Sequence, residues 1–407
     1  MLMRLHAIFG LALLPLVGGA QTLLNDGTEP VRLLPGDAAI LDSHDSRTDL
    51  PCKARPIKPE LGFDLGMHSG YEVTVPLADL AGSGNRLVAL FRVTPEGHAD
   101  RAVYMSQKWS VPTIPRDAKG SAALEGAFLL GEGRYQVDWL MRDMDDRYCS
   151  ARWQITAEPR VKEKPIELRM APGTIAPKPV EPFYNEAPLP KDDGRALKVL
   201  VLLHVASGFG MFKSHAGDTD AVLSILRGIA REPRINQYSI VAFNLERSEI
   251  LFRSDNHSEI DFKGLGETVK PNHLATVDVR TLGQKDADIQ FLHELLAAET
   301  ARSRPDALIF VGQKSAAFFG VRGVFKQADA PAYPVFYLNY DAEPTTNPWR
   351  DLIGSVVRLW NGVEYRINKP RDLFAAWNDV MFRISTQDPA AGATARSDPF
   401  TPLLPKK

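Results

Sequence analysis

The hydrophobic pattern of the chain changes at a proline-rich segment, residues 161–197, which holds seven prolines in 37 positions. Before this segment, apolar residues come in short stretches that alternate with polar residues, and after it they come in continuous runs separated by helical patterns. Alternation with a period of two is typical of strands with one buried face, whereas continuous runs are typical of parallel strands covered on both faces. The sequence therefore predicts two domains of different class, joined by a stiff, extended linker or by a segment that lies along a domain surface.

The region before the proline-rich segment, residues 21–160, has the pattern of an all-β domain. Short stretches rich in β-branched and aromatic residues are separated by Gly, Asp or Pro, and they fall at residues 71–77, 86–93, 102–109, 123–130, 134–141 and 148–155. This spacing predicts a β-sandwich. The run GEGRYQVDW (131–139) resembles the G-x-Y-x-C run before the sixth strand of immunoglobulin-like domains, with Val137 in place of Cys. The resemblance implies an immunoglobulin-like form of the sandwich.

The region after the segment, residues 198–385, alternates strands with helices. Strands are expected at 198–203, 238–244, 248–253, 307–312, 334–339 and 363–367, and helices are expected after Asp218, at 286–302 and at 370–385. This alternation predicts an α/β domain with a Rossmann-like, mainly parallel sheet and helices on both faces. Residues 386–407 lack such periodicity, and we expect them to form a flexible tail.

Three stretches of the α/β region, taken in order, resemble a von Willebrand factor A (VWA) domain. Residues 199–208 are similar to the first strand and metal loop of the family, YSIVAFNLERSEILFRSD (238–255) to its second strand and edge hairpin, and GVEYRINKPRDLFAAWNDVMFRI (362–384) to its closing strand and helix. The whole layout, a β-rich region before a VWA-like domain, is also similar to exported bacterial proteins labelled VWFA-related. The resemblance implies a VWA-like fold over residues 198–385.

The metal site of the VWA family does not carry over to this sequence. In the family, a D-x-S-x-S loop follows the first strand, a second loop supplies Thr, and an Asp follows the fourth strand. These oxygen ligands suit a hard cation such as magnesium. Here the aligned loop reads His204-Val205-Ala206-Ser207-Gly208, and Gln313 stands where the family has Asp. The resemblance therefore implies a degenerate site, for which we expect no metal and no other cofactor.

Polar residues nevertheless gather at the predicted ends of three strands. In open α/β sheets, ligands bind beyond the carboxyl ends of the strands, and these ends carry His204, Ser207, Gln313, Asn339 and Asp341. We take these five residues as candidates for binding a ligand or partner. The alternative interpretation is that His204 and Asn339 only satisfy backbone groups of the loops.

Two other functions remain open for the same edge. Ser207 with His204 as its base would make a hydrolase, although the G-x-S-x-G pattern of a nucleophile elbow is absent. A metal-dependent adhesion module with atypical ligands is the other alternative. We expect neither, and assign no catalytic residue.

The N-terminus has the composition of a secretory signal peptide over residues 1–20. Arg4 precedes an apolar stretch from Ala7 to Val17, and Gly18 and Ala20 precede a cleavage point before Gln21. The apolar stretch is shorter than the roughly 20 residues that span a bilayer, although an uncleaved anchor is the alternative. No later stretch is apolar enough to cross a membrane. We therefore expect an exported protein, periplasmic or secreted, without a membrane span once the signal is removed.

Cysteine content and charge narrow the class of function. The two cysteines, Cys52 and Cys149, suit one disulfide in an exported chain, and two buried thiols are the alternative. The chain has 48 basic and 50 acidic residues, so no basic excess indicates a nucleic-acid partner. The sequence predicts a non-enzymatic protein for protein–protein or surface interaction, with a protein partner that it does not identify.

Overall fold

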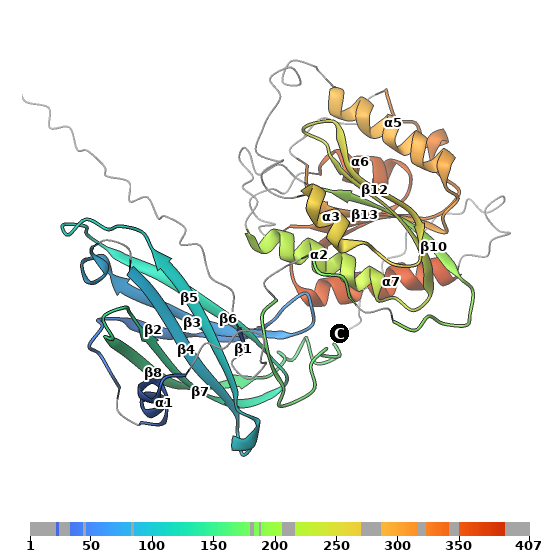
Figure 1. The fold of residues 1–407 in the computed structure, drawn as a ribbon. Coiled ribbons are helices and arrows are strands. Elements are labelled where there is room, and N and C mark those ends of the chain that lie inside the picture. The colour runs from blue at the N-terminus through green and yellow to red at the C-terminus, as the bar shows by residue number, and fades with distance from the viewer. Residues whose placement is uncertain are drawn as a thin grey trace, which may run out of the picture. The chain divides into compact units, whose positions relative to one another are not determined.

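The computed structural model describes residues 22–23, 33–43, 46–82, 85–179, 183–186, 189–205, 216–269, 286–315, 323–341 and 350–386. The chain divides into two compact units, residues 1–180 and residues 181–407 (Figure 1). The predicted signal peptide, Ser207 and residues 387–407 of the predicted tail lie outside the described residues.

The first unit consists of two antiparallel sheets. The five-stranded sheet has the order β1 (Thr22–Leu23), β5 (Val103–Val111), β4 (Asn85–Pro95), β7 (Gly133–Arg142) and β8 (Tyr148–Ala157). The four-stranded sheet has the order β2 (Lys53–Leu61), β3 (Met67–Pro76), β6 (Ser121–Leu130) and β9 (Ile175–Pro177). The six strands expected from alternating polarity are all present, as β3 to β8. β1, β2 and β9 are additions: β1 and β9 are very short, and β2 is an exposed edge strand interrupted by Pro56 and Pro59, so its alternation is weak.

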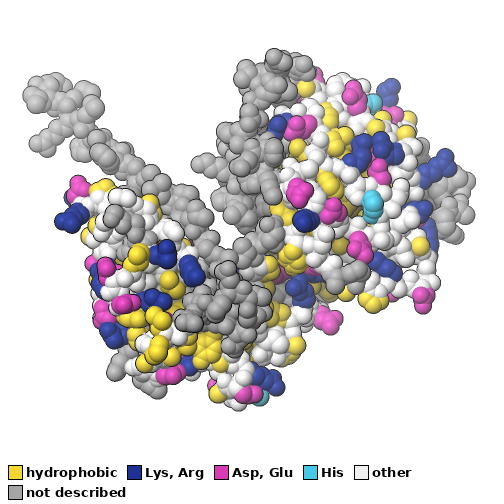
Figure 2. All heavy atoms as spheres, viewed as in Figure 1, with side chains coloured by type: hydrophobic (Ala, Val, Ile, Leu, Met, Phe, Trp, Pro, Cys, Tyr) yellow, Lys and Arg dark blue, Asp and Glu magenta, His cyan; other side chains and the backbone are white. Residues whose placement is uncertain are grey.

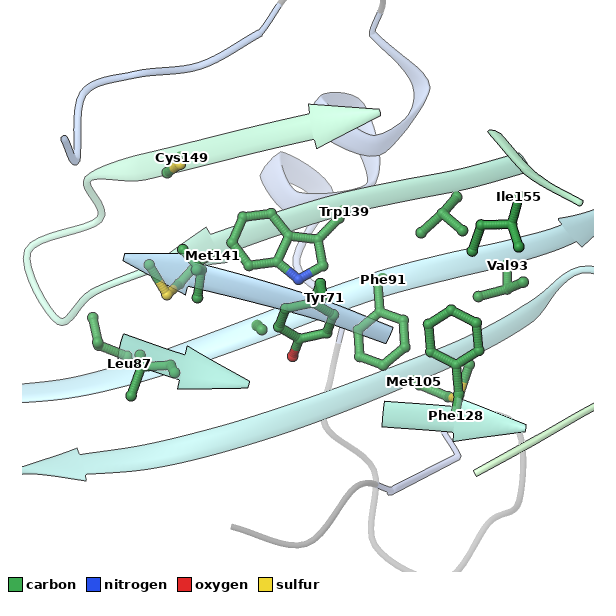
Figure 3. Packing of buried hydrophobic residues seen from close by; sticks show 14 of the residues in the cluster. Tyr71, Leu87, Phe91, Val93, Met105, Phe128, Trp139, Met141, Cys149 and Ile155 are labelled. Atoms are coloured by element: carbon green, nitrogen blue, oxygen red, sulfur yellow. The ribbon is translucent and has the colours of Figure 1, made fainter. Parts of the chain in front are cut away.

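The two sheets of the first unit share one hydrophobic core that is rich in aromatic rings. Tyr71 on β3 contacts Phe91 on β4 and Trp139 on β7, each with ring centroids 5.3 Å apart, so these pairs bridge the two sheets (Figure 3). Such pairs each contribute about 0.5–1.5 kcal/mol beyond the apolar area that they bury. The Tyr71 hydroxyl donates to Oε1 of Gln107 at 3.0 Å, so its polar end is satisfied inside the core.

A helix and a disulfide tie the start of the first unit to its five-stranded sheet. Helix α1 (Pro35–Asp42) packs Leu41 against the outer face of this sheet, beside Leu140. Cys52, just before β2, is bonded to Cys149 on β8, with a Cα–Cα distance of 6.1 Å. The predicted disulfide is therefore confirmed.

The second unit has one six-stranded sheet in the order β12 (Glu249–His257), β11 (Ile235–Asn244), β10 (Leu197–His204), β13 (Ala307–Gln313), β14 (Val335–Tyr340) and β15 (Val363–Ile367). All neighbours are parallel except β11 and β12, which form an antiparallel hairpin at one edge. Counted along the chain, the strands lie in the order third, second, first, fourth, fifth, sixth, which is the order of doubly wound α/β sheets. The predicted mainly parallel sheet is confirmed.

Helices cover both faces of this sheet (Figure 1). Helices α5 (Ala287–Arg302) and α6 (Leu352–Leu359) pack on the face that Leu202, Phe310 and Tyr337 form. Helices α2 (Ala216–Ala230), α3 (Phe262–Val269) and α7 (Pro370–Thr386) lie on the other side. Helix α6 was not predicted, because it has only 8 residues, about two turns, and its apolar face is too short to stand out in the sequence.

Parts of the proline-rich segment pack on each unit. Ile166 is buried in the core of the first unit, and β9 joins its four-stranded sheet. In the second unit, the guanidinium of Arg227 on α2 lies between the rings of Tyr184 and Phe262, at 3.9 and 4.3 Å from their centroids. Arg227 also donates to the carbonyl oxygen of Tyr184 at 2.9 Å. Residues 183–186 are thus held on α2 by cation–π and hydrogen-bond contacts.

Candidate functional site at the carboxyl edge of the parallel sheet

The candidate residues were expected at the carboxyl edge of the six-stranded sheet, where β10 and β13 lie side by side. The chain leaves β10 for α2 on one face and reaches β13 from α5 on the other (Figure 1). This change of face is the topological switch point at which open α/β sheets bind ligands. His204, Gly312, Asn339 and Arg366 stand in register across β10, β13, β14 and β15. The side chains of His204 and Asn339 therefore leave the same face of the sheet.

His204 ends β10, and its side chain is fully buried. Its Nδ1 donates a hydrogen bond to the carbonyl oxygen of Gln313 at 2.8 Å, which places a proton on Nδ1 because a carbonyl only accepts. Its Nε2 lies 3.7 Å from Oε2 of Glu246, on the turn after β11, at an ion-pair distance too long for a hydrogen bond. The imidazole thus connects the ends of three neighbouring strands.

The surroundings of His204 favour its charged form. Burial has the largest influence on the pKa of His204, and it opposes the charged imidazolium. The carboxylate of Glu246, the carbonyl of Gln313 and the charge of Asp351 all favour the imidazolium. Together they outweigh burial, so the pKa of His204 is raised above its ordinary value. A buried imidazole with a raised pKa makes this edge of the sheet sensitive to pH near neutrality.

Gly312 allows β13 to approach β10 at this point. Its φ of +139° lies where side chains are strained, and a Cβ would stand 2.3 Å from the carbonyl oxygen of His204. Glycine avoids this clash because it has no Cβ. The close approach brings the next carbonyl, that of Gln313, within reach of the His204 ring.

A second polar group, which the sequence analysis missed, lies at the N-terminus of α6. Asp351 caps this helix by accepting a hydrogen bond at 2.8 Å from its first turn, and it also accepts one from the backbone N–H of Ser315 at 2.9 Å. The Tyr337 hydroxyl lies 3.2 Å from Oδ2 of Asp351 and 3.3 Å from the carbonyl oxygen of Gln313. Burial raises the pKa of Asp351, although the backbone N–H groups oppose this shift. Tyr337 thus links the Asp351 carboxyl to the carbonyl that holds His204.

A third polar group surrounds the end of β14. Nδ2 of Asn339 donates to Oε1 of Glu364 at 2.8 Å, and Oε2 of Glu364 accepts from Arg350 at 3.1 Å. Oδ1 of Asn339 is buried and has no hydrogen-bond partner among the described residues. Asp341, which follows β14, forms an ion pair at 3.1 Å with Lys314, and both side chains are nearly buried.

The structure therefore brings four of the five predicted residues to one edge, and Ser207 lies outside the described residues. His204 and Gln313 are bonded directly, although Gln313 contributes its backbone carbonyl. Other members of the edge were not predicted: Glu246, Lys314, Ser315, Tyr337, Arg350, Asp351 and Glu364. Only Asp351 had a local signal, as an Asp directly before an apolar helix. The others lie far from His204 in the sequence, so no local pattern connects them.

The chemistry of the edge is that of hydrogen bonding in a shielded environment. Nε2 of His204 and Oδ2 of Asp341 are buried and lie in ion pairs with Glu246 and Lys314. Two further buried polar atoms of this edge, Oγ of Ser315 and Oδ1 of Asn339, have no hydrogen-bond partner among the described residues. Buried polar atoms are nearly always paired, so these atoms are available to water or to a bound group. No cluster of three or more His, Cys, Asp or Glu side chains suited to a metal ion occurs in the described part of the chain.

Comparison of the chain with models of protein families and with curated protein sequences finds no match. Within the described ranges, no helix is both long enough and apolar enough to cross a membrane. On the face shown in Figure 2, acidic and basic side chains are interspersed over both units.

Proposed function

We propose that the chain is an exported, non-enzymatic interaction protein whose second unit is a VWA-like domain without the metal of that family. The strand order and the antiparallel hairpin at β11 and β12 support this assignment, because a VWA-like domain is a doubly wound sheet with one antiparallel edge strand. The degenerate loop from His204 and the Gln313 in place of Asp support the absence of metal.

The first unit is proposed to be an immunoglobulin-like sandwich. Its sheets match that topology when β2, β3 and β6 are taken as strands A, B and E, and β4, β7 and β8 as strands C, F and G. The hydroxyl of Tyr135, near the start of β7, donates to the carbonyl oxygen of Gly131 at 2.8 Å. A tyrosine bonded back to the backbone at this corner is a hallmark of such domains. This unit would present the second unit to partners.

Export is supported by the disulfide, because such bonds persist in oxidising compartments. Mass spectrometry of the mature protein tests this part of the proposal. We expect an N-terminus at Gln21, in open or cyclised form. A mature protein that retains Met1 would contradict cleavage of the signal.

The observation that carries the proposed binding role is two buried polar atoms without a hydrogen-bond partner among the described residues, at the carboxyl edge of the sheet. Oγ of Ser315 and Oδ1 of Asn339 belong to residues at the ends of the neighbouring strands β13 and β14, and both are shielded from water. A partner that supplies matching groups there would gain hydrogen bonds in a low-dielectric setting. Such an edge suits recognition of a protein surface.

A matched pair of substitutions tests this role. Gln313→Ala removes a partly exposed side chain from the carboxyl edge and keeps the backbone carbonyl that holds His204. Gln237→Ala makes the same change near the amino end of β11, at the opposite edge of the sheet. Each variant is used to capture partners from the exported fraction of the source cells. We expect Gln313→Ala to recover partners about fivefold less well, as for an interface residue, and Gln237→Ala to match the unaltered protein.

Equal recovery by both variants at equal folded concentration would contradict a binding role for this edge. The hydrolase alternative is tested with a serine-reactive phosphonate. Labelling that disappears in Ser207→Ala would replace the proposed interaction protein by an enzyme.

A further inference from the structure

Four consecutive residues of the proline-rich segment, 183–186, contact helices α2 and α3 of the second unit, and each of the four side chains has its own contact there. We call these four residues the docked segment. The residues beneath them form what we call the α2–α3 surface: Arg227, Arg231, Phe262, Lys263 and Gly266. The arginines lie in and just after the last turns of α2, before the chain enters β11 at the amino edge of the sheet, so this surface is separate from the candidate site at the carboxyl edge.

The first half of the docked segment is aromatic. The ring of Tyr184 stacks on the Arg227 guanidinium, and the Phe262 ring lies on the same guanidinium. Phe183 packs on Gly266 so closely that a Cβ at residue 266 would stand 2.4 Å from its Cγ. A contact that short is not tolerated, so a glycine in α3 makes the place that Phe183 fills. The α2–α3 surface thus provides two adjacent places for aromatic rings, one on a cation and one on bare helix backbone.

The second half of the docked segment is polar. Oδ1 of Asn185 accepts a hydrogen bond at 3.1 Å from the N–H of Lys263, in the first turn of α3, where a helix leaves its own N–H groups unpaired. The Glu186 carboxylate accepts two hydrogen bonds from Arg231, at 2.8 and 2.5 Å, and lies 3.3 Å from Nη1 of Arg227. A carboxylate bound by both donors of one arginine is fixed in direction as well as in charge. The surface therefore favours an amide followed by a carboxylate.

The docked segment is less buried than the side chains that it covers. Its four residues are half-buried or exposed and have neither helix nor strand structure, whereas Arg227 and Phe262 are only 4% and 2% exposed. A short segment of this kind opens at a lower free energy than the unit as a whole. Opening would uncover Arg227 without its aromatic and carboxylate partners, which is costly. The opened surface therefore favours any chain that supplies the same groups.

We propose that the α2–α3 surface is a second binding site of the protein, for a peptide segment of a partner protein. The segment that it takes carries two aromatic residues followed by an amide and a carboxylate, and residues 183–186 are the internal competitor for that place. A competitor on the same chain has an effective concentration on the order of millimolar. A partner therefore enters only when its segment binds more tightly or when the docked segment is displaced.

Emptying the surface in the full chain and refilling it with a peptide provides the test. The double variant Tyr184→Ala/Glu186→Ala removes the internal competitor and leaves α2 and α3 unaltered. A fluorescently labelled peptide EPFYNEAP, the sequence of residues 181–188, is then titrated and followed by anisotropy. We expect it to bind the double variant about tenfold or more tighter than the unaltered chain, and to raise the transition temperature of the second unit. A peptide with alanine in place of its tyrosine and second glutamate should bind about tenfold more weakly.

A matched pair of glycine substitutions locates the bound peptide. Added to the double variant, Gly266→Ala fills the place of the first ring and should weaken peptide binding about tenfold. Gly228→Ala, on α2 with no atom within 4 Å of its Cβ, should leave binding unchanged. If the double variant does not fold, Tyr184→Ala alone keeps the ion pairs of Glu186 and takes its place in every measurement. The proposal is overturned if the folded variant binds the peptide no more tightly than the unaltered chain, if the altered peptide binds equally well, or if Gly266→Ala has no more effect than Gly228→Ala.

Discussion

Replacing His204 by alanine should destabilise the second unit without affecting the first. The imidazole is fully buried, stacks beside Phe243 with ring centroids 5.5 Å apart, and donates the 2.8 Å hydrogen bond to the carbonyl oxygen of Gln313. Loss of a buried ring leaves a cavity that costs about 2 kcal/mol or more. Loss of the imidazole N–H donor costs about 1 kcal/mol, which is at the low end of the cost of leaving a buried group unsatisfied. The cost is low because the Tyr337 hydroxyl still reaches the same carbonyl oxygen of Gln313. The expected loss is therefore about 3 kcal/mol, a large share of a typical unfolding free energy.

The size of this loss should depend on pH. The pKa of His204 is raised in the folded protein, so its charged form stabilises the fold. That contribution is complete below the unfolded pKa of histidine, about 6.5, and is lost as pH rises through the raised folded pKa. The gap in stability between the unaltered protein and His204→Ala should therefore be larger at about pH 5.5 than at about pH 9. Asp351 is present in both proteins, so its direct titration largely cancels in the comparison.

Differential scanning calorimetry of the full chain measures both effects. The two units should unfold in separate thermal transitions. Reduction of the disulfide should lower the transition temperature of the first unit alone, and this shift identifies which transition belongs to the first unit. His204→Ala is compared with Gln237→Ala at both pH values. The reasoning about His204 is refuted if the two variants have the same second-unit transition, or if the gap for His204→Ala does not change with pH.

Four further outcomes are expected. Reducing the bond between Cys52 and Cys149, whose sequence separation is 97, should destabilise the first unit by about 4–5 kcal/mol, and two alkylatable thiols in protein purified without reductant would contradict the bond. Gly312→Ala should cost more than about 2 kcal/mol in chemical denaturation, whereas Gly228→Ala, inside α2 with open space around it, should stabilise by up to about 1 kcal/mol. Tyr135→Phe should cost about 1 kcal/mol in the melting of the first unit, through the lost corner hydrogen bond. Isothermal titration with magnesium should show no specific heat, and a chelator should leave partner binding unchanged, because the edge lacks the oxygen set of a hard cation.

Much of the fold was predictable because it follows from local periodicity. Strands buried on one face alternate in polarity, and strands buried on both faces are continuously apolar, so β3 to β8 and the six strands of the second unit were found from the sequence. The elements that escaped show such a period weakly or over too short a stretch. β2 is exposed along most of its length and interrupted by prolines, and α6 is amphipathic but only 8 residues long.

The candidate site was predictable only as a set of strand ends. Parallel strands end at one edge, so His204, Asn339 and Asp341 could be placed there from the sequence. Their contacts could not, because the hydrogen bond from His204 joins residues 109 positions apart, and its acceptor is a backbone carbonyl that every residue type possesses. His204 was a candidate for binding, but its side chain is fully buried, so the partly exposed side chain of Gln313 is the better probe of binding.

The docking of residues 183–186 on α2 determines where the chain can be divided. The sequence pattern suggests a fragment that starts at Lys198, the first residue of the apolar strand. Such a fragment would lack Tyr184, which stacks on the Arg227 guanidinium, and Glu186, which forms ion pairs with Arg227 and Arg231. A buried guanidinium without these partners is costly, and the exposed ring of Phe262 would add an apolar patch. A recombinant second unit should therefore begin before residue 183 to be soluble. A protease that cuts the chain on the N-terminal side of residue 183 should likewise release a stable second unit.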